Sequence, residues 1–317
     1  MWAYLFRRLA YNMPVYLGVI LLVMAALRVN DPVYAYLGKN VTEEQIEARR
    51  ESMGLKEPFL AQYAVMVKQI ATLDFDTMSW RQQGTTVGEL MSKAIWPSLA
   101  LTVPALILTS VISICVSIIA AFFRGRTIDR SLVVIAVLGM SISFLVYIIV
   151  GQYFGAYLLN EKLNTEIFAI HGYKSGILNW PRYCLLPVLI SVIVAMGYDT
   201  RFYRAVMVEE SNRDYITTAK AKGASRQKIM FVHMLKNAMI PIVTRISITL
   251  PFLIVGSILL EVYFGIPGMG QALISAVTNQ DFPVVQAFTA VFAGLYILTN
   301  LMTDVMYALL DPRVRLS

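Results

Sequence analysis

The chain has 317 residues, of which 57% are hydrophobic and only 15% are charged, and its formal net charge at pH 7 is +7. No water-soluble domain of this length needs so apolar a composition, so these values exclude that class and indicate a protein that crosses a membrane several times. The positive charge does not indicate nucleic-acid binding, because it is concentrated in short loops beside apolar segments rather than in a stripe on one polar face.

Six apolar runs are candidate membrane spans. At 1.5 Å per residue, a helix of about 20 residues crosses the ~30 Å hydrocarbon core of a bilayer. The runs cover residues 9–27, 97–123, 132–159, 185–198, 246–264 and 284–310. A cleaved signal peptide is the alternative for the first run, but that run is longer than the usual signal core of about 7–15 residues. We therefore predict six spans, which place both termini on the same side of the membrane.

The segment between the first two spans is the only long hydrophilic part of the chain. Residues 28–96 contain eight Lys/Arg and nine Asp/Glu, the mixture expected for a folded surface in water. Thr42 and Gln45 form a capping box that opens a helix, and Gly54 ends it. Pro58 suits the first turn of a second helix. The apolar face of this second helix consists of Phe59, Tyr63, Val67 and Ile70. The segment is therefore predicted to form a small helical cap outside the cytoplasm.

Lys and Arg are distributed unequally between the two sides of the membrane. Outside the long hydrophilic segment, the side that holds the termini carries 16 Lys/Arg and the other side carries three. Residues 201–245 alone contain nine Lys/Arg and three acidic residues. Because short loops rich in Lys and Arg remain in the cytoplasm, both termini and the 201–245 loop are predicted to be cytoplasmic.

This basic loop is predicted to contain two short helices joined at a corner. Ser211, with Asp214 three residues later, resembles a cap at the start of the first helix. Gly223 can adopt the left-handed conformation that ends this helix. Ser225 can cap the second helix, and Pro241 is expected to interrupt it.

Small side chains in the first of these helices alternate with lysines. Ala219, Ala221 and Gly223 allow another surface to approach the backbone closely, while Lys220 and Lys222 supply attraction and orientation. Such a surface could contact a soluble partner, but a basic loop taken by itself favours an amphipathic hairpin that contacts only lipid headgroups. A further alternative is that the lysines serve only membrane topology.

The sequence contains no catalytic or metal-binding motif. It has no Gly-x-x-x-x-Gly-Lys-Ser/Thr phosphate loop, no His-Glu-x-x-His and no Gly-x-Ser-x-Gly, and its two cysteines and two histidines lack metal-ligand spacing. The acidic residues Asp199, Glu261 and Asp304 lie near span ends, where we expect water to reach them, whereas an ion-coupled transporter favours acids near the bilayer centre. These observations favour a transport subunit that takes its energy from a partner.

Three groups of residues carry a resemblance to a known family. They are Asp214-Tyr215, Thr218-Ala219-Lys220-Ala221-Lys222-Gly223 and Asn237-Ala238-Met239-Ile240-Pro241 in the basic loop; Asp31-Pro32, Thr42-Glu43-Glu44-Gln45-Ile46, Gly54-Leu55 and Gln62-Tyr63 near the N-terminus; and Glu261-Val262-Tyr263-Phe264, Pro267-Gly268-Met269-Gly270, Asp281-Phe282-Pro283-Val284-Val285-Gln286 and Asp311-Pro312-Arg313 near the C-terminus. Together they resemble the first permease subunit, with its long N-terminal extracytoplasmic segment, of oligopeptide/dipeptide-type (peptide/nickel branch) ABC importers.

The chain departs from the pattern of that family in three places, one of which is Val29-Asn30, where the family usually has Pro-Gly. Thr217-Thr218-Ala219 stands where the broader importer pattern has Glu-Ala-Ala, which favours the peptide-type branch. Ser143 stands where many relatives carry a proline in the third span, so we expect no kink there.

The resemblance implies a coupling helix that sits in a cleft of an ATPase. Its predicted residues are Asp214, Tyr215, Thr218, Ala219, Lys220, Ala221, Lys222 and Gly223. The implied partners are a second permease subunit in a heterodimer, two ATPase subunits or domains, and an extracytoplasmic substrate-binding protein. ATP and Mg are expected on the partner ATPases, and no cofactor is expected in this chain.

The combined interpretation is an all-α integral membrane protein of the bacterial inner membrane, with six transmembrane helices and a small helical extracytoplasmic segment after the first span. Residues 1–28 are predicted to form the cytoplasmic N-terminal end and first span, 29–96 the extracytoplasmic segment, and 97–317 a five-helix permease core with the coupling loop 201–245. The expected function is a permease subunit without its own ATPase site, which couples ATP hydrolysis to alternating access for peptides or related small solutes. An ion-coupled secondary transporter or channel, or a structural membrane subunit without transport, are the alternatives.

Overall fold

The computed structural model describes residues 2–29, 32–37, 42–249 and 258–310. These residues form helices joined by turns and loops. The described part of the chain contains no β-strand and only an isolated antiparallel bridge between Met78 and Thr86.

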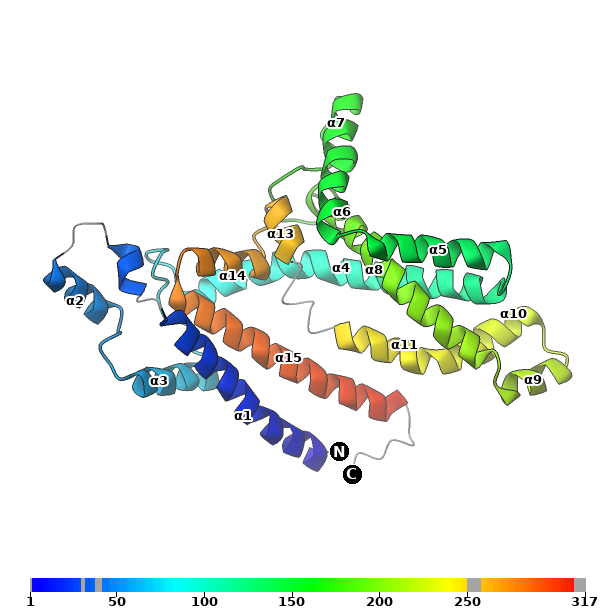
Figure 1. Cartoon of the computed structure of the whole chain (residues 1–317), viewed down its shortest axis with the longest axis horizontal. Coiled ribbons are helices and arrows are strands. Elements are labelled where there is room, and N and C mark those ends of the chain that lie inside the picture. Colours follow the sequence, from blue (N-terminus) through cyan, green and yellow to red (C-terminus); the bar gives the residue numbers. More distant parts are fainter. Residues whose placement is uncertain (1, 30–31, 38–41, 250–257, 311–317) are drawn as a thin grey trace. The chain divides into compact units, whose positions relative to one another are not determined.

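The chain divides into two compact units, each with its own apolar core. The first consists of Met1–Pro97 with Pro267–Leu301, and the second of Ser98–Ile266 with Met302–Leu316. Figure 1 labels the helices. In chain order the elements are α1 (Trp2–Leu27), η1 (Pro32–Tyr36), α2 (Glu43–Ser52), α3 (Phe59–Thr72), α4 (Val87–Phe122), α5 (Thr127–Ser141), α6 (Phe144–Val150), η2 (Gly151–Tyr157), α7 (Leu158–Leu163), α8 (Trp180–Glu210), α9 (Asp214–Ala221), α10 (Arg226–Lys228), η3 (Ile229–Met234), α11 (Leu235–Thr249), α13 (Ile258–Phe264), α14 (Met269–Thr278) and α15 (Phe282–Leu310).

Five helices of the described residues are long and apolar enough to cross a membrane, and the number rises to seven if each of two bent helix pairs counts as one span. The five are Phe6–Leu27, Val87–Phe122, Trp180–Glu210, Arg226–Thr249 and Phe282–Val305. Large apolar side chains such as Leu22, Ile107 and Ile193 are exposed on these helices, an arrangement that suits lipid rather than water. The all-α integral membrane fold is therefore confirmed, with the six predicted spans inside the observed range.

The prediction of an unkinked third span is wrong. The helical run is bent by 93° between α5 and α6, at Ile142 and Ser143, whose backbones are extended with ψ angles of 136° and 139°. Two extended residues end a helix without any proline, because their backbone groups leave the helical hydrogen-bond ladder. The hydroxyl of Tyr147 in α6 donates to the carbonyl of Gly139 in α5 at 2.9 Å, which holds the corner.

Pro241 does not interrupt the second helix of the basic loop, contrary to the prediction. It lies inside α11, and α10, η3 and α11 together form one candidate span, Arg226–Thr249. The proline removes one backbone hydrogen bond, a loss that a helix packed against its neighbours tolerates in a membrane. Ala238 and Ile242, on either side of it, are fully buried.

The predicted fifth span at 246–264 is only partly described, because residues 250–257 lie outside the described residues. Glu261, on α13, is fully buried, so the expected access of water to this carboxylate is wrong. The hydroxyl of Ser98 in α4 donates to the carboxylate at 2.6 Å. The chain turns sharply after α13, where the Ile266 N–H donates to the Glu261 carbonyl at 2.8 Å. A position near the end of a span therefore does not make this side chain accessible.

Helix α2 of the hydrophilic segment begins and ends as predicted. Thr42 and Gln45 form a capping box at its start. Gly54 has a φ angle of +68°, and the N–H of Leu55 donates to the Arg50 carbonyl at 2.9 Å, which satisfies one of the last carbonyls of the helix.

Helix α3 packs its apolar face against the core of the first unit, as predicted. Phe59, Tyr63 and Ile70 contact the buried cluster that includes Met66 and residues of α1 and α15. The hydroxyl of Tyr63 also donates to the Leu17 carbonyl of α1 at 3.0 Å. The second helix of the hydrophilic segment is therefore attached to the first span by both apolar and polar contacts.

Asp281, which immediately precedes α15, anchors the end of the hydrophilic segment. Its carboxylate is buried and accepts hydrogen bonds from the hydroxyl of Ser79 and from the backbone N–H of Trp80, the latter at 3.1 Å. The ring of Trp80 contacts the rings of Tyr36 and Phe282, with centroid distances of 6.1 and 5.6 Å. The partners of Asp281 lie about 200 positions away along the chain, so no local pattern reveals the contact.

We predict that Asp281→Ala lowers the free energy of unfolding of the first unit by about 1–3 kcal/mol, because two buried donors lose their acceptor. Thermal unfolding of the purified chain in detergent, followed by tryptophan fluorescence, measures the change. Asp281→Asn keeps an acceptor oxygen, so this matched control should lose less. Equal stability of Asp281→Ala and the unchanged chain would contradict the anchor.

Candidate functional site

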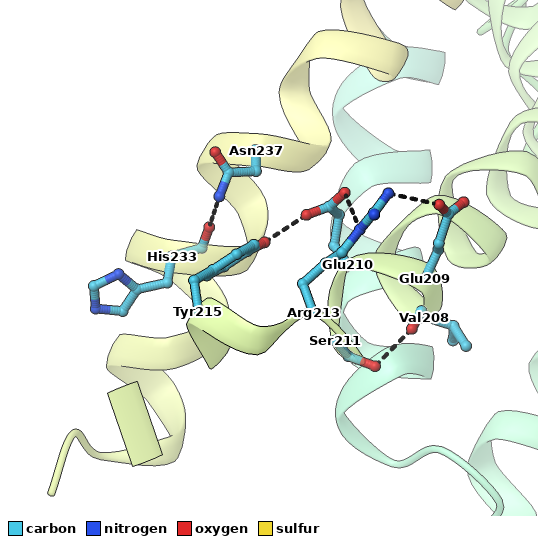
Figure 2. Close-up of polar contacts among 8 residues, drawn as sticks. All are labelled: Val208, Glu209, Glu210, Ser211, Arg213, Tyr215, His233 and Asn237. Atoms are coloured by element: carbon cyan, nitrogen blue, oxygen red, sulfur yellow. Dashed lines mark hydrogen bonds and ion pairs between the residues drawn. The ribbon is translucent and has the colours of Figure 1, made fainter. Parts of the chain in front are cut away.

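The residues predicted to contact a partner lie on α9 and in the turn that follows it. Figure 2 shows the polar contacts at the start of this helix. The hydroxyl of Ser211 donates to the Val208 carbonyl of α8 at 2.7 Å, so the prediction that Ser211 caps α9 is wrong. Helix α8 continues to Glu210, and the hydroxyl is used at its C-terminal turn. The residue before α9 is Arg213, whose extended backbone (φ −74°, ψ 150°) starts the helix without a side-chain cap.

Three residues tie α9 to the end of α8, and we call Glu210, Arg213 and Tyr215 the α8–α9 clamp (Figure 2). The phenol of Tyr215 donates to the carboxylate of Glu210 at 2.5 Å, and the guanidinium of Arg213 lies 3.6 Å from the same carboxylate. The Glu210 side chain is only 17% exposed, so water screens its hydrogen bond with Tyr215 weakly, whereas the Arg213 side chain is 55% exposed and its ion pair is screened. Burial, and then the hydrogen bond to Glu210, raise the pKa of Tyr215 above its ordinary value. The phenol therefore remains protonated and donates at neutral pH.

The turn between the two helices of the loop has the predicted caps. Gly223 has a φ angle of +74°, the left-handed conformation expected at the end of α9. The N–H of Ala224 donates to the Ala219 carbonyl at 3.1 Å, which satisfies a carbonyl in the last turn of α9. Ser225 then caps α10, because its hydroxyl accepts from the N–H of Lys228 at 3.3 Å.

Helix α9 has a buried face and an exposed face. Ile216 and Ala219 are buried in an apolar cluster that includes Met230 and Met234 of η3. The small side chain of Ala219 therefore allows α9 to pack on η3, inside the chain. Tyr215 is half-buried and belongs to the clamp. The predicted site residues that remain exposed are Asp214, Thr218, Lys220, Ala221, Lys222 and Gly223. They form the surface of α9 and its C-terminal turn that another protein can contact.

The sequence analysis missed a buried ion pair between α5 and α8. Arg204 donates through Nε and Nη2 to both carboxylate oxygens of Asp129, at 2.6 and 2.8 Å. The N–H of Gly125 donates to the same carboxylate at 2.9 Å, and the Asp129 side chain is only 4% exposed. A bidentate, desolvated pair of this kind fixes the geometry of the two helices. The sequence feature that could have indicated this pair is Asp129 itself, a single acidic residue within the basic turn of residues 124–130.

A second ion pair joins α8 to α11. Nε of Arg245 lies 3.4 Å from Oδ1 of Asp199, whose side chain is 13% exposed, and the guanidinium lies over the ring of Phe202 at 5.8 Å from its centroid. Helix α8 is therefore attached to α5, to α11 and, through the clamp, to α9. These contacts connect α9 to α8, and α8 to two further helices.

The exposed surface of α9 suits contact with another protein. Within the described residues, no group of three or more His, Cys, Asp and Glu side chains is placed to hold a metal ion. The exposed surface of α9 combines the cations Lys220 and Lys222 with the small residues Ala221 and Gly223. Cations on a rigid surface orient an approaching partner, and small residues permit close contact.

Comparisons with known proteins show what this chain is similar to. The family described as "Binding-protein-dependent transport system inner membrane component" matches residues 113–316, a range that includes α9 and the ion pairs that α8 makes with α5 and α11. A probable peptide ABC transporter permease protein of Sinorhizobium fredii is 32% identical over 99% of this chain and 100% of its own length. A glutathione transport system permease protein of Escherichia coli is 32% identical, with 98% of each chain covered. An oligopeptide transport system permease protein of Bacillus subtilis is 29% identical over 98% of this chain and 99% of its own length.

We predict that Arg204→Ala lowers the free energy of unfolding of the second unit by about 3–5 kcal/mol, because it leaves the Asp129 carboxylate buried without its cation. Arg213→Ala is the matched control. Its side chain is 55% exposed, so its ion pairs should contribute less than about 1 kcal/mol. Chemical unfolding of the purified chain in detergent measures both.

A double variant separates loss of the pair from loss of packing. Arg204→Met with Asp129→Leu removes both charges and should recover most of the stability that Arg204→Ala loses. Equal losses in Arg204→Ala and Arg213→Ala would contradict the assignment of the Asp129–Arg204 pair as the stronger contact.

Proposed function

The chain belongs to the family of binding-protein-dependent transport system inner membrane components, and from this premise we propose that it is the permease subunit through which partner ATPases drive the uptake of peptides or related small solutes. The names of its relatives support the substrate class, because they are permeases for peptides, oligopeptides and glutathione. This chain has no phosphate loop, so ATP and Mg belong on the partner ATPases.

The single observation that carries the mechanism is the attachment of α9. Its inner face is buried against η3, its first turn is bonded to Glu210, and its outer face presents Lys220, Ala221 and Lys222. An ATPase cleft that grips this outer face moves α8 with α9. The Asp129–Arg204 pair then carries α5, and the Asp199–Arg245 pair carries α11. The result is a rigid-body switch between two orientations of the helices, the physical basis of alternating access.

The membrane orientation follows from the distribution of charge. Lys and Arg are concentrated at both termini and around the loop between the candidate spans Trp180–Glu210 and Arg226–Thr249. We therefore assign the termini and this loop, which contains α9, to the cytoplasm of a bacterial cell and the chain to its inner membrane. Residues 1–28 then form the cytoplasmic end and the first span, 29–96 lie outside the cytoplasm, and 97–317 form the permease core. The hydrophilic segment 29–96 is the part of the chain that a substrate-binding protein meets first.

The proposed assembly contains a second permease subunit beside this one, in a heterodimer, with two ATPase subunits or domains beneath and a substrate-binding protein outside. Many large apolar side chains on the candidate spans are exposed, and a second permease subunit would cover part of this surface.

We predict that Ala221→Trp lowers association with the partner ATPases at least tenfold and abolishes vanadate-sensitive, binding-protein-dependent uptake in proteoliposomes. Ala221 is exposed, so a large side chain there blocks a partner without disturbing the core of the loop. Lys222→Glu should weaken association through charge instead of size. Co-purification of the ATPases with the permease measures both effects.

Gln227→Trp is the control, because Gln227 is exposed on α10, outside the predicted site. Normal ATPase association in Ala221→Trp would show that α9 is not the docking helix. Uptake driven by a pH gradient without any ATPase would instead favour the ion-coupled transporter, in which the buried Glu261 is the first carboxylate to test.

A further inference from the structure

A cavity of about 550 Å³ lies behind α9, in the second unit. The end of α4, the turn between α8 and α9, and the helices α10 and η3 contribute its walls. Three cations, Arg124, Lys220 and Arg226, line it together with the buried side chains of Met230 and Met234. No carboxylate belongs to the described residues that line this cavity, so its interior favours an anion.

The two arginines of the cavity are held in place by neutral partners. Nη1 of Arg124 donates to the side-chain oxygen of Asn212 at 3.2 Å. Arg226 donates to the carbonyl of Phe122, and its guanidinium lies over the ring of the same residue at 4.2 Å from the centroid. Arg124 also interacts electrostatically with the carboxylate of Asp129. Both oxygens of that carboxylate, however, already accept hydrogen bonds from Arg204. The charge of the cavity is therefore not compensated by an ion pair to Arg124, Lys220 or Arg226 within the described chain.

The cations stand where two candidate spans meet the membrane surface. One span ends at Phe122, just before Arg124, and another begins at Arg226. The headgroups of a bilayer lie at this level, and basic pockets at the ends of transmembrane helices bind anionic lipid headgroups. The lining also contains apolar residues beside the cations, Phe122, Met230 and Met234, of which Phe122 is only half-buried. A soluble phosphate compound contacts only the cations, whereas a phospholipid contacts both the cations and the apolar residues of the lining.

We propose that this cavity binds an anionic phospholipid, with the headgroup phosphate among Arg124, Lys220 and Arg226 and an acyl chain against Met230 and Met234. Arg124 follows α4, Lys220 is on α9 and Arg226 starts α10, so one phosphate joins three helical elements. The bound lipid stiffens the attachment of α9 to the spans. Lys220 belongs both to this cavity and to the predicted docking surface, so the lipid site is tested on the permease alone, with variants that leave Lys220 unchanged.

The test uses the purified full-length chain, stripped of native lipid in neutral detergent, and measures binding by native mass spectrometry and thermophoresis. The probes are short-chain phosphatidylglycerol, phosphatidylcholine with the same acyl chains, and inorganic phosphate. We expect saturable binding of phosphatidylglycerol, at least tenfold tighter than of phosphatidylcholine. Inorganic phosphate should bind at least tenfold more weakly than phosphatidylglycerol, because it cannot use the apolar surface.

Paired variants distinguish binding in this cavity from general electrostatic attraction to the basic surface around it. Arg124→Gln with Arg226→Gln should weaken phosphatidylglycerol binding at least tenfold. Arg126→Gln with Arg130→Gln removes the same amount of charge from exposed positions near Arg124 but outside the cavity lining, and should change binding less than twofold. The single variant Arg124→Gln, at an exposed side chain, should weaken binding about threefold and keeps the test valid if the double variant does not fold.

Three results would overturn the proposal. Equal losses in the two double variants would show general attraction by the basic turn. Binding of inorganic phosphate as tight as that of phosphatidylglycerol would show a site for a soluble phosphate compound. Equal binding of phosphatidylglycerol and phosphatidylcholine would show no headgroup selectivity.

Discussion

A helix outside the lipid can move transmembrane helices only if it is firmly attached to them. In this chain the α8–α9 clamp attaches α9 to α8. The phenol of Tyr215 donates to a mostly buried carboxylate at the last residue of α8, and the inner face of α9 is buried against η3. Hydrogen bonds to charged groups contribute about 1.5–3 kcal/mol each, and apolar burial adds to this. Helix α9 is therefore part of the bundle rather than a loop attached to it, which is the condition that the proposed coupling role requires.

The sequence was sufficient for the features that depend on local pattern. Apolar length predicts four of the five long candidate membrane helices of the described residues, and the other, Arg226–Thr249, begins inside the predicted basic loop. The capping box at Thr42 predicts the start of α2, and Gly223 and Ser225 predict the turn after α9. Each of these depends on residues within a few positions of one another, so propensity and spacing are informative. The family resemblance adds the function, because fold alone does not specify it.

The features that the sequence did not reveal depend on contacts between distant residues. The Asp129–Arg204 pair, the anchor at Asp281 and the inward position of Ala219 all arise from packing between elements far apart in the chain. The bend at Ile142 and Ser143 has no proline, and the apolar run through it is continuous, so neither signal marks it. The hydroxyl of Ser211 lies between two helices that could both use it, and it donates to a carbonyl of α8 instead of capping α9.

The central claim is that α9 faces the cytoplasm and is covered by a partner ATPase. The most direct measurement is labelling of Ala221→Cys with a membrane-impermeant maleimide, with Cys115 and Cys184 replaced by serine. Labelling in inside-out vesicles but not in intact spheroplasts, with protection when the ATPases are bound, is the predicted result. Labelling from the outer surface, or unchanged labelling in the assembled transporter, would contradict the account.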